Sequence, residues 1–328
     1  MTVAPSRVVV RAPNWLGDVV LSLPAVRDIR SAFPAARLAV VARPSVAALY
    51  EAVPEVDEVR VAAGFTAEVA AMRGNFDLAI LLPNSIGTAL ATVVARIPAR
   101  WGFATQGRGG LLTRAVAVPD SVRGSSQVNY YRAMLAAMGL PTSAGADTSL
   151  APPPAWRDQG RALLGPGVFF GVAPGAAKGT AKQWPPERFA AAADRLSATL
   201  EATAVLLGSA ADAEAGRAVA AAMKAPSLDL CGRTDLRAFV GVVASLQALV
   251  ANDSGAMHLG AAVGIPTVGV FGPTNAEETH PVGARATFVR GVADCSPCRH
   301  VTCPIDHRCM TTVSPDAVVD ALLREVRA

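Results

Sequence analysis

The sequence is poor in aromatic residues and in charge. Only 5% of its 328 residues are Phe, Trp or Tyr and 17% are charged, whereas 52% are hydrophobic because alanine and valine are abundant. This composition excludes an intrinsically disordered chain and is typical of a globular, helix-rich protein. A chain of this length exceeds what one hydrophobic core usually supports, so two domains are expected.

Long apolar runs and basic clusters are also missing. The apolar stretches 243–251 and 259–271 are bounded or broken by polar residues, glycine or proline, well short of the ~18 residues of a membrane-spanning helix. The N-terminus shows no signal-peptide pattern. The net charge of +4 favours anionic ligands, but no basic run with interleaved aromatics predicts nucleic-acid binding. We therefore expect a cytoplasmic protein without a transmembrane segment.

Two familiar nucleotide-binding motifs are absent. No Gly-x-Gly-x-x-Gly follows the first expected strand, which disfavours an NAD-dependent dehydrogenase. No Gly-Lys-Ser/Thr sequence ends a phosphate-binding loop, which disfavours ATP hydrolysis.

Short runs rich in Val, Leu and Ile alternate with longer alanine-rich stretches, which predicts β-α-β units and parallel sheets covered on both faces. The pattern restarts after Pro152-Pro153-Pro154, which we interpret as an interdomain linker because proline continues neither a helix nor a central strand. The predicted architecture is α/β and GT-B-like, with doubly wound, Rossmann-like domains at 1–151 and 155–328 facing a central cleft. Strands are expected at 7–12, 37–43, 76–83, 168–175, 202–209, 227–232, 248–255 and 266–273, and helices at 17–33, 45–51, 85–95, 187–199, 211–223, 235–244 and 255–263.

The loops that follow strands are the candidate sites, because ligands bind open α/β sheets beyond the carboxyl ends of the strands. The first such loop, RAPNWLGDVV, places Asp18 near the positive end of a helix. This carboxylate is a candidate catalytic base. The alternative is an ordinary acidic residue in the first turn of a helix.

The loop VAPGAAKGTAKQWPPERF combines glycine, proline and two lysines ahead of a helix. Backbone N–H groups together with Lys178 and Lys182 suit phosphate oxygens; the alternative is a solvated basic loop with Trp184 as a packing anchor. In the next loop, VLLGSAADAEAGRAV, Ser209 is a candidate ligand for a base or ribose, or equally a simple helix cap.

The most specific loop is ALVANDSGAMHLGAAVGIPTVGVFGP. Asp253, Ser254 and Gly255 lie between a strand and a helix of small residues that carries His258 one turn in. The helix N-terminus would offer backbone donors to a diphosphate, and Gly255 permits close approach. A lone helix histidine is more often a packed residue, but its position beside this cluster favours a ligand contact for His258.

Four of the five cysteines are crowded into C-x2-C-x4-C-x5-C, with His300 and His307 among them. The first pair has the spacing of zinc ligands, but the remaining spacings are irregular. We favour a structural role without metal, with a zinc or iron–sulfur centre as the alternative. Cys231, which follows a strand, is expected to be buried. The crowded cysteines are Cys295, Cys298, Cys303 and Cys309.

Together these motifs resemble those of glycosyltransferase family 9, and the ADP-heptose:lipopolysaccharide heptosyltransferase II group looks most similar. The resemblance covers nearly the whole chain in the same order. It implies two Rossmann-like domains, the first binding a lipid-linked acceptor and the second a sugar-nucleotide donor. The motifs that carry it are GD at 17–18, LLPNS at 81–85, PGAAKGTAKQWP at 174–185, LLGS at 206–209 and NDSGAMHLGAA at 252–262.

The resemblance implies inverting transfer of a heptose from ADP-heptose to the inner-core heptose of a Kdo-lipid A acceptor, with Asp18 as the base and Lys182 at the diphosphate. Asp253, Ser254, Gly255 and His258 match the donor-binding motif. The sequence has no Asp-x-Asp motif for a metal, so we expect no cofactor and no divalent ion. The enzyme would act peripherally at the cytoplasmic face of the inner membrane. Its expected acceptor contacts are Asn14, Asn84, Ser85 and Arg108.

Three alternatives stay open at this point. The first is another family 9 transferase with a different sugar donor or core acceptor. The second is a nucleotide-sugar epimerase of GT-B-like fold, and the third is a non-catalytic module that binds sugar nucleotides. Asp18 discriminates against the last, because a binding module has no need of a base.

Overall fold

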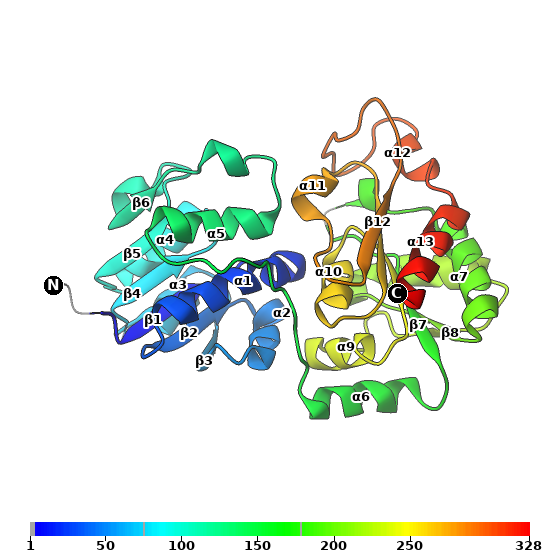
Figure 1. Cartoon of the computed structure of the whole chain (residues 1–328), viewed down its shortest axis with the longest axis horizontal. Helices are drawn as coiled ribbons and strands as arrows, with labels where there is room; N and C mark the ends of the chain where they lie inside the picture. Colours follow the sequence, from blue (N-terminus) through cyan, green and yellow to red (C-terminus); the bar gives the residue numbers. More distant parts are fainter. Residues whose placement is uncertain (1–3, 75, 178) are drawn as a thin grey trace. The chain divides into compact units, whose positions relative to one another are not determined.

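The computed structural model describes residues 4–74, 76–177 and 179–328. The chain divides into two compact units, Met1–Thr148 and Ser149–Ala328, which Figure 1 shows in blue to green and in green to red. Each unit contains a six-stranded sheet whose paired strands are all parallel. The predicted α/β class with two doubly wound sheets is therefore confirmed.

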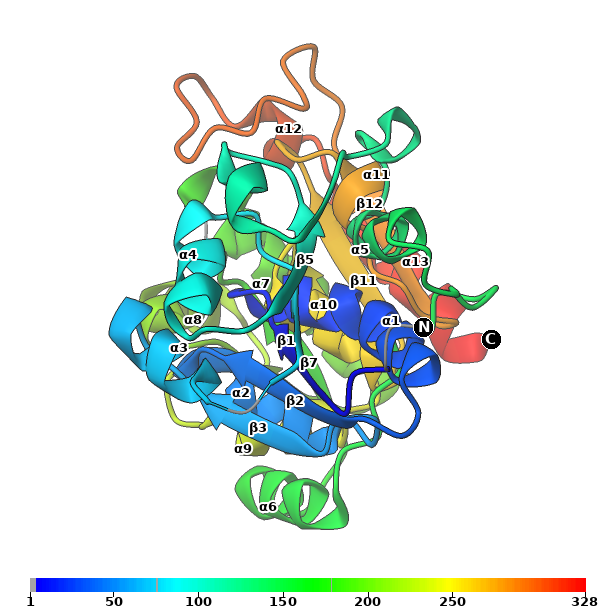
Figure 2. The same ribbon diagram turned by 90° about the vertical axis from the view of Figure 1, so that its left-hand side faces the viewer.

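The first unit has the strand order β3-β2-β1-β4-β5-β6. Its elements are β1 (Arg7–Arg11), α1 (Leu16–Ala32), β2 (Arg37–Ala42), α2 (Pro44–Ala47), η1 (Ala48–Ala52), β3 (Glu58–Val61), α3 (Phe65–Met72), β4 (Leu78–Leu81), α4 (Ile86–Val94), β5 (Ala99–Phe103), η2 (Arg108–Leu111), β6 (Arg114–Val116), η3 (Asp120–Val122) and α5 (Gln127–Ala137). The chain reverses its direction across the sheet after β3, so α1 packs with α5 and α3 packs with α4 (Figure 2). The switch between β1 and β4 is where such sheets bind ligands.

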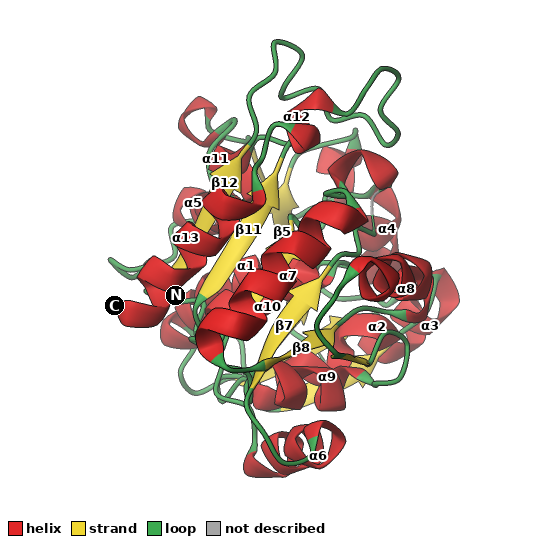
Figure 3. Ribbon diagram, turned by 90° about the vertical axis from the view of Figure 1, so that its right-hand side faces the viewer, coloured by secondary structure: helices red, strands yellow, loops and turns green. Residues whose placement is uncertain are grey.

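The second unit repeats this winding with the order β12-β11-β10-β7-β8-β9. Its elements are α6 (Pro154–Leu164), β7 (Phe169–Ala173), η4 (Thr180–Lys182), α7 (Pro186–Leu200), β8 (Thr203–Leu206), η5 (Ala210–Asp212), α8 (Ala213–Ala222), β9 (Ser227–Asp229), α9 (Leu236–Val243), β10 (Leu249–Asn252), α10 (Gly255–Ala262), β11 (Thr267–Phe271), α11 (Ala276–Thr279), β12 (Ala286–Arg290), α12 (Arg308–Thr311) and α13 (Pro315–Arg327). Figure 3 shows α7 and α13 in front of this sheet, and the two helices pack together. The switch here lies between β10 and β7.

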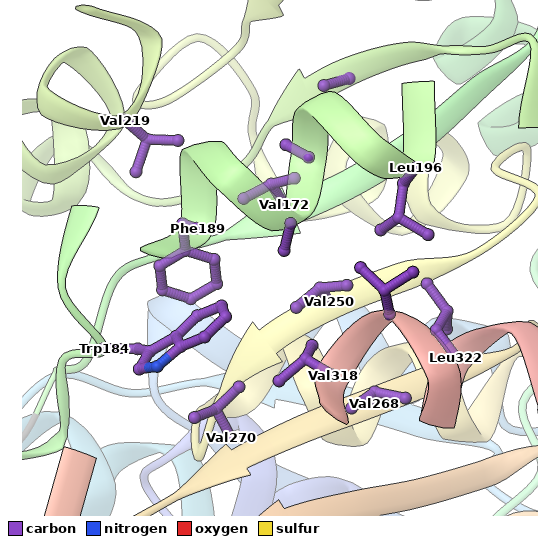
Figure 4. Close-up of a cluster of buried hydrophobic side chains, with 14 of the residues drawn as sticks. Val172, Trp184, Phe189, Leu196, Val219, Val250, Val268, Val270, Val318 and Leu322 are labelled. Carbon is purple, nitrogen blue, oxygen red and sulfur yellow. The ribbon is translucent and has the colours of Figure 1, made fainter. Parts of the chain in front are cut away.

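A dense apolar core lies between the second sheet and the helices α7 and α13. Strand residues such as Val172 and Val250 meet Leu196 from α7 and Leu322 from α13 (Figure 4). At the end of this core the indole of Trp184 packs edge-on against Phe189, with ring centroids 4.9 Å apart. The core therefore extends to the loop that follows β7.

One local expectation needs correction. The helix expected at 45–51 is the four-residue α2 followed by the 3-10 turn η1, which begins at Ala48. Helix α6, which begins at the last residue of the proline run, Pro154, was not predicted from the sequence. Proline is favourable there, since the first helical N–H has no partner within the helix and the fixed φ of proline suits the helix start.

Helices α6 and α9 pack so closely that their backbone atoms touch. A Cβ atom added at Gly160 would collide with the backbone of Gly241, and one added at Gly241 would collide with the carbonyl oxygen of Trp156. Only glycine permits this approach, so α6 and α9 are held close together where Gly160 and Gly241 meet.

We predict that Gly241→Ala lowers the free energy of unfolding by ~1–3 kcal/mol or more, because backbone atoms cannot yield to the added methyl group. Gly87→Ala is the matched control: Gly87 lies in α4 with nothing within 4 Å of its added Cβ. It should leave stability unchanged or raise it by up to ~1 kcal/mol. Urea unfolding followed by circular dichroism measures both, and equal effects would contradict the close packing.

Candidate active site

A polar cluster lies beyond the carboxyl ends of β7 and β10 in the second unit. The Nζ atom of Lys182 lies 2.5 Å from Oδ2 of Asp253, and the hydroxyl of Thr274 donates to the same oxygen at 2.8 Å. The Asp253 side chain is nearly buried and that of Lys182 is 16% exposed. Two residues that lie far apart in the sequence are thus brought together, as the sequence predicts for a shared site.

The loop between β7 and α7, here called the lysine loop, has this conformation because hydrogen bonds hold both of its ends. The Asn252 side chain, which has no exposed surface, accepts a hydrogen bond from the backbone N–H of Trp184 at 3.0 Å and donates to the carbonyl oxygen of Pro174 at 2.7 Å. The indole N–H of Trp184 also donates to Val313. Trp184 is therefore a packing anchor, as the alternative interpretation of this loop supposed.

His258 lies one turn into α10 and is 4% exposed. Burial lowers the pKa of its imidazole to about 4, a fall that Lys182 and His280 reinforce and Asp253 partly offsets. The ring is therefore neutral at neutral pH. Within the described residues its Nδ1 atom has no hydrogen-bond partner, although it is buried. A neutral, unsatisfied imidazole beside Asp253 is suited to hydrogen-bond a polar ligand.

The other residues predicted to bind the sugar-nucleotide donor differ in where they lie. Ser254 is the N-cap residue of α10 and Gly255 its first residue, so both lie at a helix N-terminus beside the cluster. The Ser209 hydroxyl bonds Asp212 at 2.7 Å within a capping box. In the structure Ser209 thus acts as a helix cap, which was the alternative interpretation. A contact of Ser209 with the sugar-nucleotide donor stays a prediction. Lys178 lies outside the described residues.

The cysteine-rich segment packs against this cluster. The backbone N–H groups of Cys298 and Arg299 donate to Pro273, next to Thr274, and the carbonyl oxygen of Val301 accepts from Ala181 at 3.1 Å. A Cβ atom at Gly179, whose φ is +109°, would collide with that carbonyl. The segment therefore supports the lysine loop through its backbone.

The thiols of this segment differ in exposure. Cys295 is exposed, Cys298 and Cys303 are half-buried, and Cys309 is buried in the core of the second unit. In the part of the chain that the structure describes, no three Cys, His, Asp or Glu side chains are arranged to hold a metal ion. Cys231 is buried as expected, and burial with the nearby Asp229 raises its pKa to about 12.

In the first unit, Asp18 lies in the first turn of α1, beyond the carboxyl end of β1. Its charge acts on the buried phenol of Tyr131: burial raises the pKa of Tyr131 well above its usual range, and Asp18 adds to the rise. Tyr131 follows Tyr130 on α5, and the Tyr130 hydroxyl accepts from the Asn84 amide at 2.7 Å. Neighbouring residues of α5 thus lie near Asp18 and in contact with Asn84, another predicted site residue.

The loop between β1 and Asp18 rests on a buried ion pair. The Nη2 atom of Arg11 lies 2.5 Å from Oε1 of Glu68 on α3, and the two side chains are only 2% and 9% exposed. The same guanidinium donates to the Ala12 carbonyl oxygen and, at 2.9 Å, to Oδ1 of Asn14. The predicted acceptor residue Asn14 is therefore held in place by Arg11.

Arg108 is wholly buried and its guanidinium is used on the protein itself. It donates to the carbonyl oxygens of Phe103, Pro83 and Ser85, and burial lowers its pKa to about 10. Ser85 is the N-cap of α4. Arg108 thus shapes the loop that presents Asn84 and Ser85, and its direct contact with an acceptor stays a prediction.

Comparison with known proteins identifies the family of this two-unit chain. A model of the family described as glycosyltransferase family 9 (heptosyltransferase) matches residues 68–308. The chain belongs to glycosyltransferase family 9. It is 30% identical to lipopolysaccharide heptosyltransferase 2 of Salmonella typhimurium over 96% of this chain and 97% of that one, and 32% identical to the Escherichia coli K12 enzyme of the same name over 87% and 88%. The solved structure of E. coli ADP-heptose lps heptosyltransferase II matches with a TM-score of 0.85 at 27% identity, covering 98% of both chains.

Several residues of this family 9 site were missed by sequence reasoning. Thr274, in the loop after β11, bonds Asp253, and Glu68 on α3 pairs with Arg11. The loop motifs do not reveal the position of either residue. Trp15 had a local signal. It is the N-cap residue of α1, three residues before Asp18, and is 48% exposed, whereas Trp156 and Trp184 are buried. Among the described residues, no helix is both long and apolar enough to cross a membrane.

We predict that Glu68→Gln lowers the free energy of unfolding by ~3 kcal/mol, because it leaves the buried Arg11 charge without its counter-ion. The control is Asp120→Asn, which removes an ion pair with Arg123 whose partners are 68% and 94% exposed. Solvent screens that pair, so its loss should leave the urea midpoint unchanged. A Glu68 variant as stable as the control would refute the structural role of the buried pair.

Proposed function

We propose that this chain transfers a heptose from ADP-L-glycero-D-manno-heptose to the inner-core heptose of lipopolysaccharide, on a heptosyl-Kdo-lipid A acceptor. The observation that carries the proposal is the cluster of Lys182, Asp253 and His258 at the N-terminus of α10, in a family 9 chain. It is supported by near full-length similarity to enzymes named lipopolysaccharide heptosyltransferase 2. Membership of a glycosyltransferase family decides against the epimerase and the binding module.

In this proposal the second unit binds the donor. The diphosphate of ADP-heptose would lie between the Lys182 ammonium and the free N–H groups of α10, which together offset the charge that grows as ADP leaves. Asp253 orients Lys182 through their ion pair. His258, neutral at neutral pH, adds a hydrogen bond without another charge.

The first unit would bind the acceptor and supply the base. Asp18 would take the proton of the attacking acceptor hydroxyl as its oxygen bonds to the anomeric carbon of the heptose. The bond from that carbon to the phosphate oxygen breaks on the opposite face, and ADP departs with the electron pair. One displacement of this kind inverts the anomeric configuration.

We also propose that the transfer requires no divalent metal and that the enzyme works peripherally at the cytoplasmic face of the inner membrane. Lys182 and the α10 N-terminus provide positive charge that glycosyl transfer otherwise obtains from a metal ion. The lipid-linked acceptor accounts for the membrane location.

We expect Asp18→Asn to lower turnover by ~100-fold or more, because the amide cannot accept the proton, and to leave ADP affinity within about threefold. Turnover is measured by mass spectrometry of a truncated lipopolysaccharide incubated with ADP-heptose. Asp120→Asn, an exposed change in the same unit, serves as the control. Near-normal turnover of Asp18→Asn would remove this residue from the role of base.

Lys182→Gln should weaken ADP binding by about ten-fold to a hundred-fold, since a charged hydrogen bond to the diphosphate is worth ~1.5–3 kcal/mol. Calorimetric titration with ADP measures this. Lys224→Gln is the matched control. The chain has three lysines, Lys178, Lys182 and Lys224, and Lys224 is exposed.

The same wild-type preparation should transfer heptose at an unchanged rate in excess EDTA. An ADP affinity in Lys182→Gln equal to that of the control would refute the phosphate role of Lys182. A strict requirement for magnesium or manganese would refute metal independence.

A further inference from the structure

Helix α4 has an aliphatic outer face. Its residues Ile86, Leu90 and Val94 are 53%, 41% and 41% exposed and follow one another at a spacing of four, so they form one stripe along the helix. The opposite face, with Thr88 and Ala89, packs on the sheet. A surface helix normally presents polar or charged residues to water, yet α4 contains no charged residue at all.

The chain around this stripe carries charge of one sign. From 78 to 119 the sequence contains no Asp or Glu but four arginines. Arg108 is buried, whereas Arg96 and Arg114 are exposed and Arg100 is half-buried. No ion pair to any of these four is found in the residues that the structure describes. Because Arg108 is buried and Arg100 and Arg114 donate to backbone carbonyl oxygens, the exposed Arg96 at the end of α4 is the arginine of the four that is most accessible to an outside anion.

At its C-terminal end the stripe leads to a basic hollow of about 670 Å³. Three arginines line it, Arg7, Arg73 and Arg96, and among its described lining residues Asp77 is the one that is acidic. The carboxylate of Asp77 is already held by the backbone N–H groups of Ser6 and Arg7 and by the Ser6 hydroxyl. The hollow thus favours anions next to an apolar surface.

We propose that the outer face of α4, with the hollow at its end, docks the first unit onto a bilayer of anionic phospholipid. The aliphatic stripe would enter the interface between head groups and acyl chains, and the arginines would contact lipid phosphates. Figure 2 shows α4 on the outside of the first unit beside α3. The inference rests on the proposed function, because it adds the surface that brings the enzyme to a lipid-linked acceptor.

The placement of α4 relates this surface to the acceptor site. Ser85, a predicted acceptor residue, is the N-cap of α4, and Ile86 is the first residue of the stripe. A saccharide held at Asn84 and Ser85 would therefore have its lipid end close to the apolar face. The combination of an aliphatic stripe with unpaired arginines favours an anionic lipid surface over a second copy of this chain, whose own basic face would repel it.

The test is co-sedimentation of the full-length chain with vesicles of about 30 mol% phosphatidylglycerol in phosphatidylcholine, without acceptor. The wild type should bind these vesicles and release them as salt rises, and pure phosphatidylcholine vesicles should bind at least about tenfold more weakly. The double variant Leu90→Gln/Val94→Gln should lower the partition coefficient at least about tenfold. Leu163→Gln, an exposed leucine of α6 in the second unit, should change it less than twofold.

A second variant, Arg96→Asn, keeps the aliphatic stripe and removes one charge at its end. Its residue has φ +62°, which asparagine tolerates, so the fold should be kept and anionic selectivity should fall. Equal binding of all variants, or equal binding of neutral and anionic vesicles, would overturn the proposal. So would a double variant that loses self-association in analytical ultracentrifugation but keeps vesicle binding. Transfer to a soluble, truncated acceptor should be unchanged in every variant, which separates failure of this surface from failure of the proposed reaction.

Discussion

The carboxamide of Asn252 holds the lysine loop of the second unit at both ends. It accepts from Trp184 and donates to Pro174, and it is fully buried between them. Because its oxygen and its nitrogen are both used, loss of either contact would leave a buried polar group unsatisfied. The next residue along β10 is Asp253, so the same strand end that fixes the loop also carries the carboxylate that pairs with Lys182. The geometry of the Lys182–Asp253 cluster depends on this side chain.

Much of the fold could be predicted from the sequence because buried parallel strands are continuous apolar runs. RVVVR and LVAN are recognisable for this reason, and each is followed by a loop that bears unusual residues. The edge strands β3, β6 and β12 lack this signal. The edge strand β3, EVRV, is half-exposed and carries two charges, and β12 is similar, so neither stands out from a loop. The triple proline indicated a boundary between two units, which the structure places a few residues earlier, after Thr148. Pro154 itself begins helix α6.

Site residues could be predicted from the sequence where they belong to one strand–helix connection. They could not be predicted where residues far apart in the chain come into contact only in the folded protein. Asp253 and His258 belong to one strand–helix connection, so their proximity follows from local structure. Arg108 is different: it lies in a glycine-rich stretch that reads as an exposed loop, yet η2 folds it beneath the loop after β4. Burial of that kind depends on tertiary packing, and no local pattern reports it. Glu68 and Thr274 were hidden for the same reason.

The contact of Val301 with the lysine loop restricts which sequence changes the cysteine-rich segment can tolerate. Its carbonyl oxygen lies against Gly179 and accepts from Ala181, while the backbone of Cys298 is bound to Pro273. These contacts are made by main-chain atoms, so they are indifferent to which side chains the segment carries. They are sensitive to its length, because one residue more or less between 298 and 301 would carry the carbonyl away from the loop. Most side chains of this surface segment can therefore be exchanged, but insertions and deletions there are as poorly tolerated as in a buried strand.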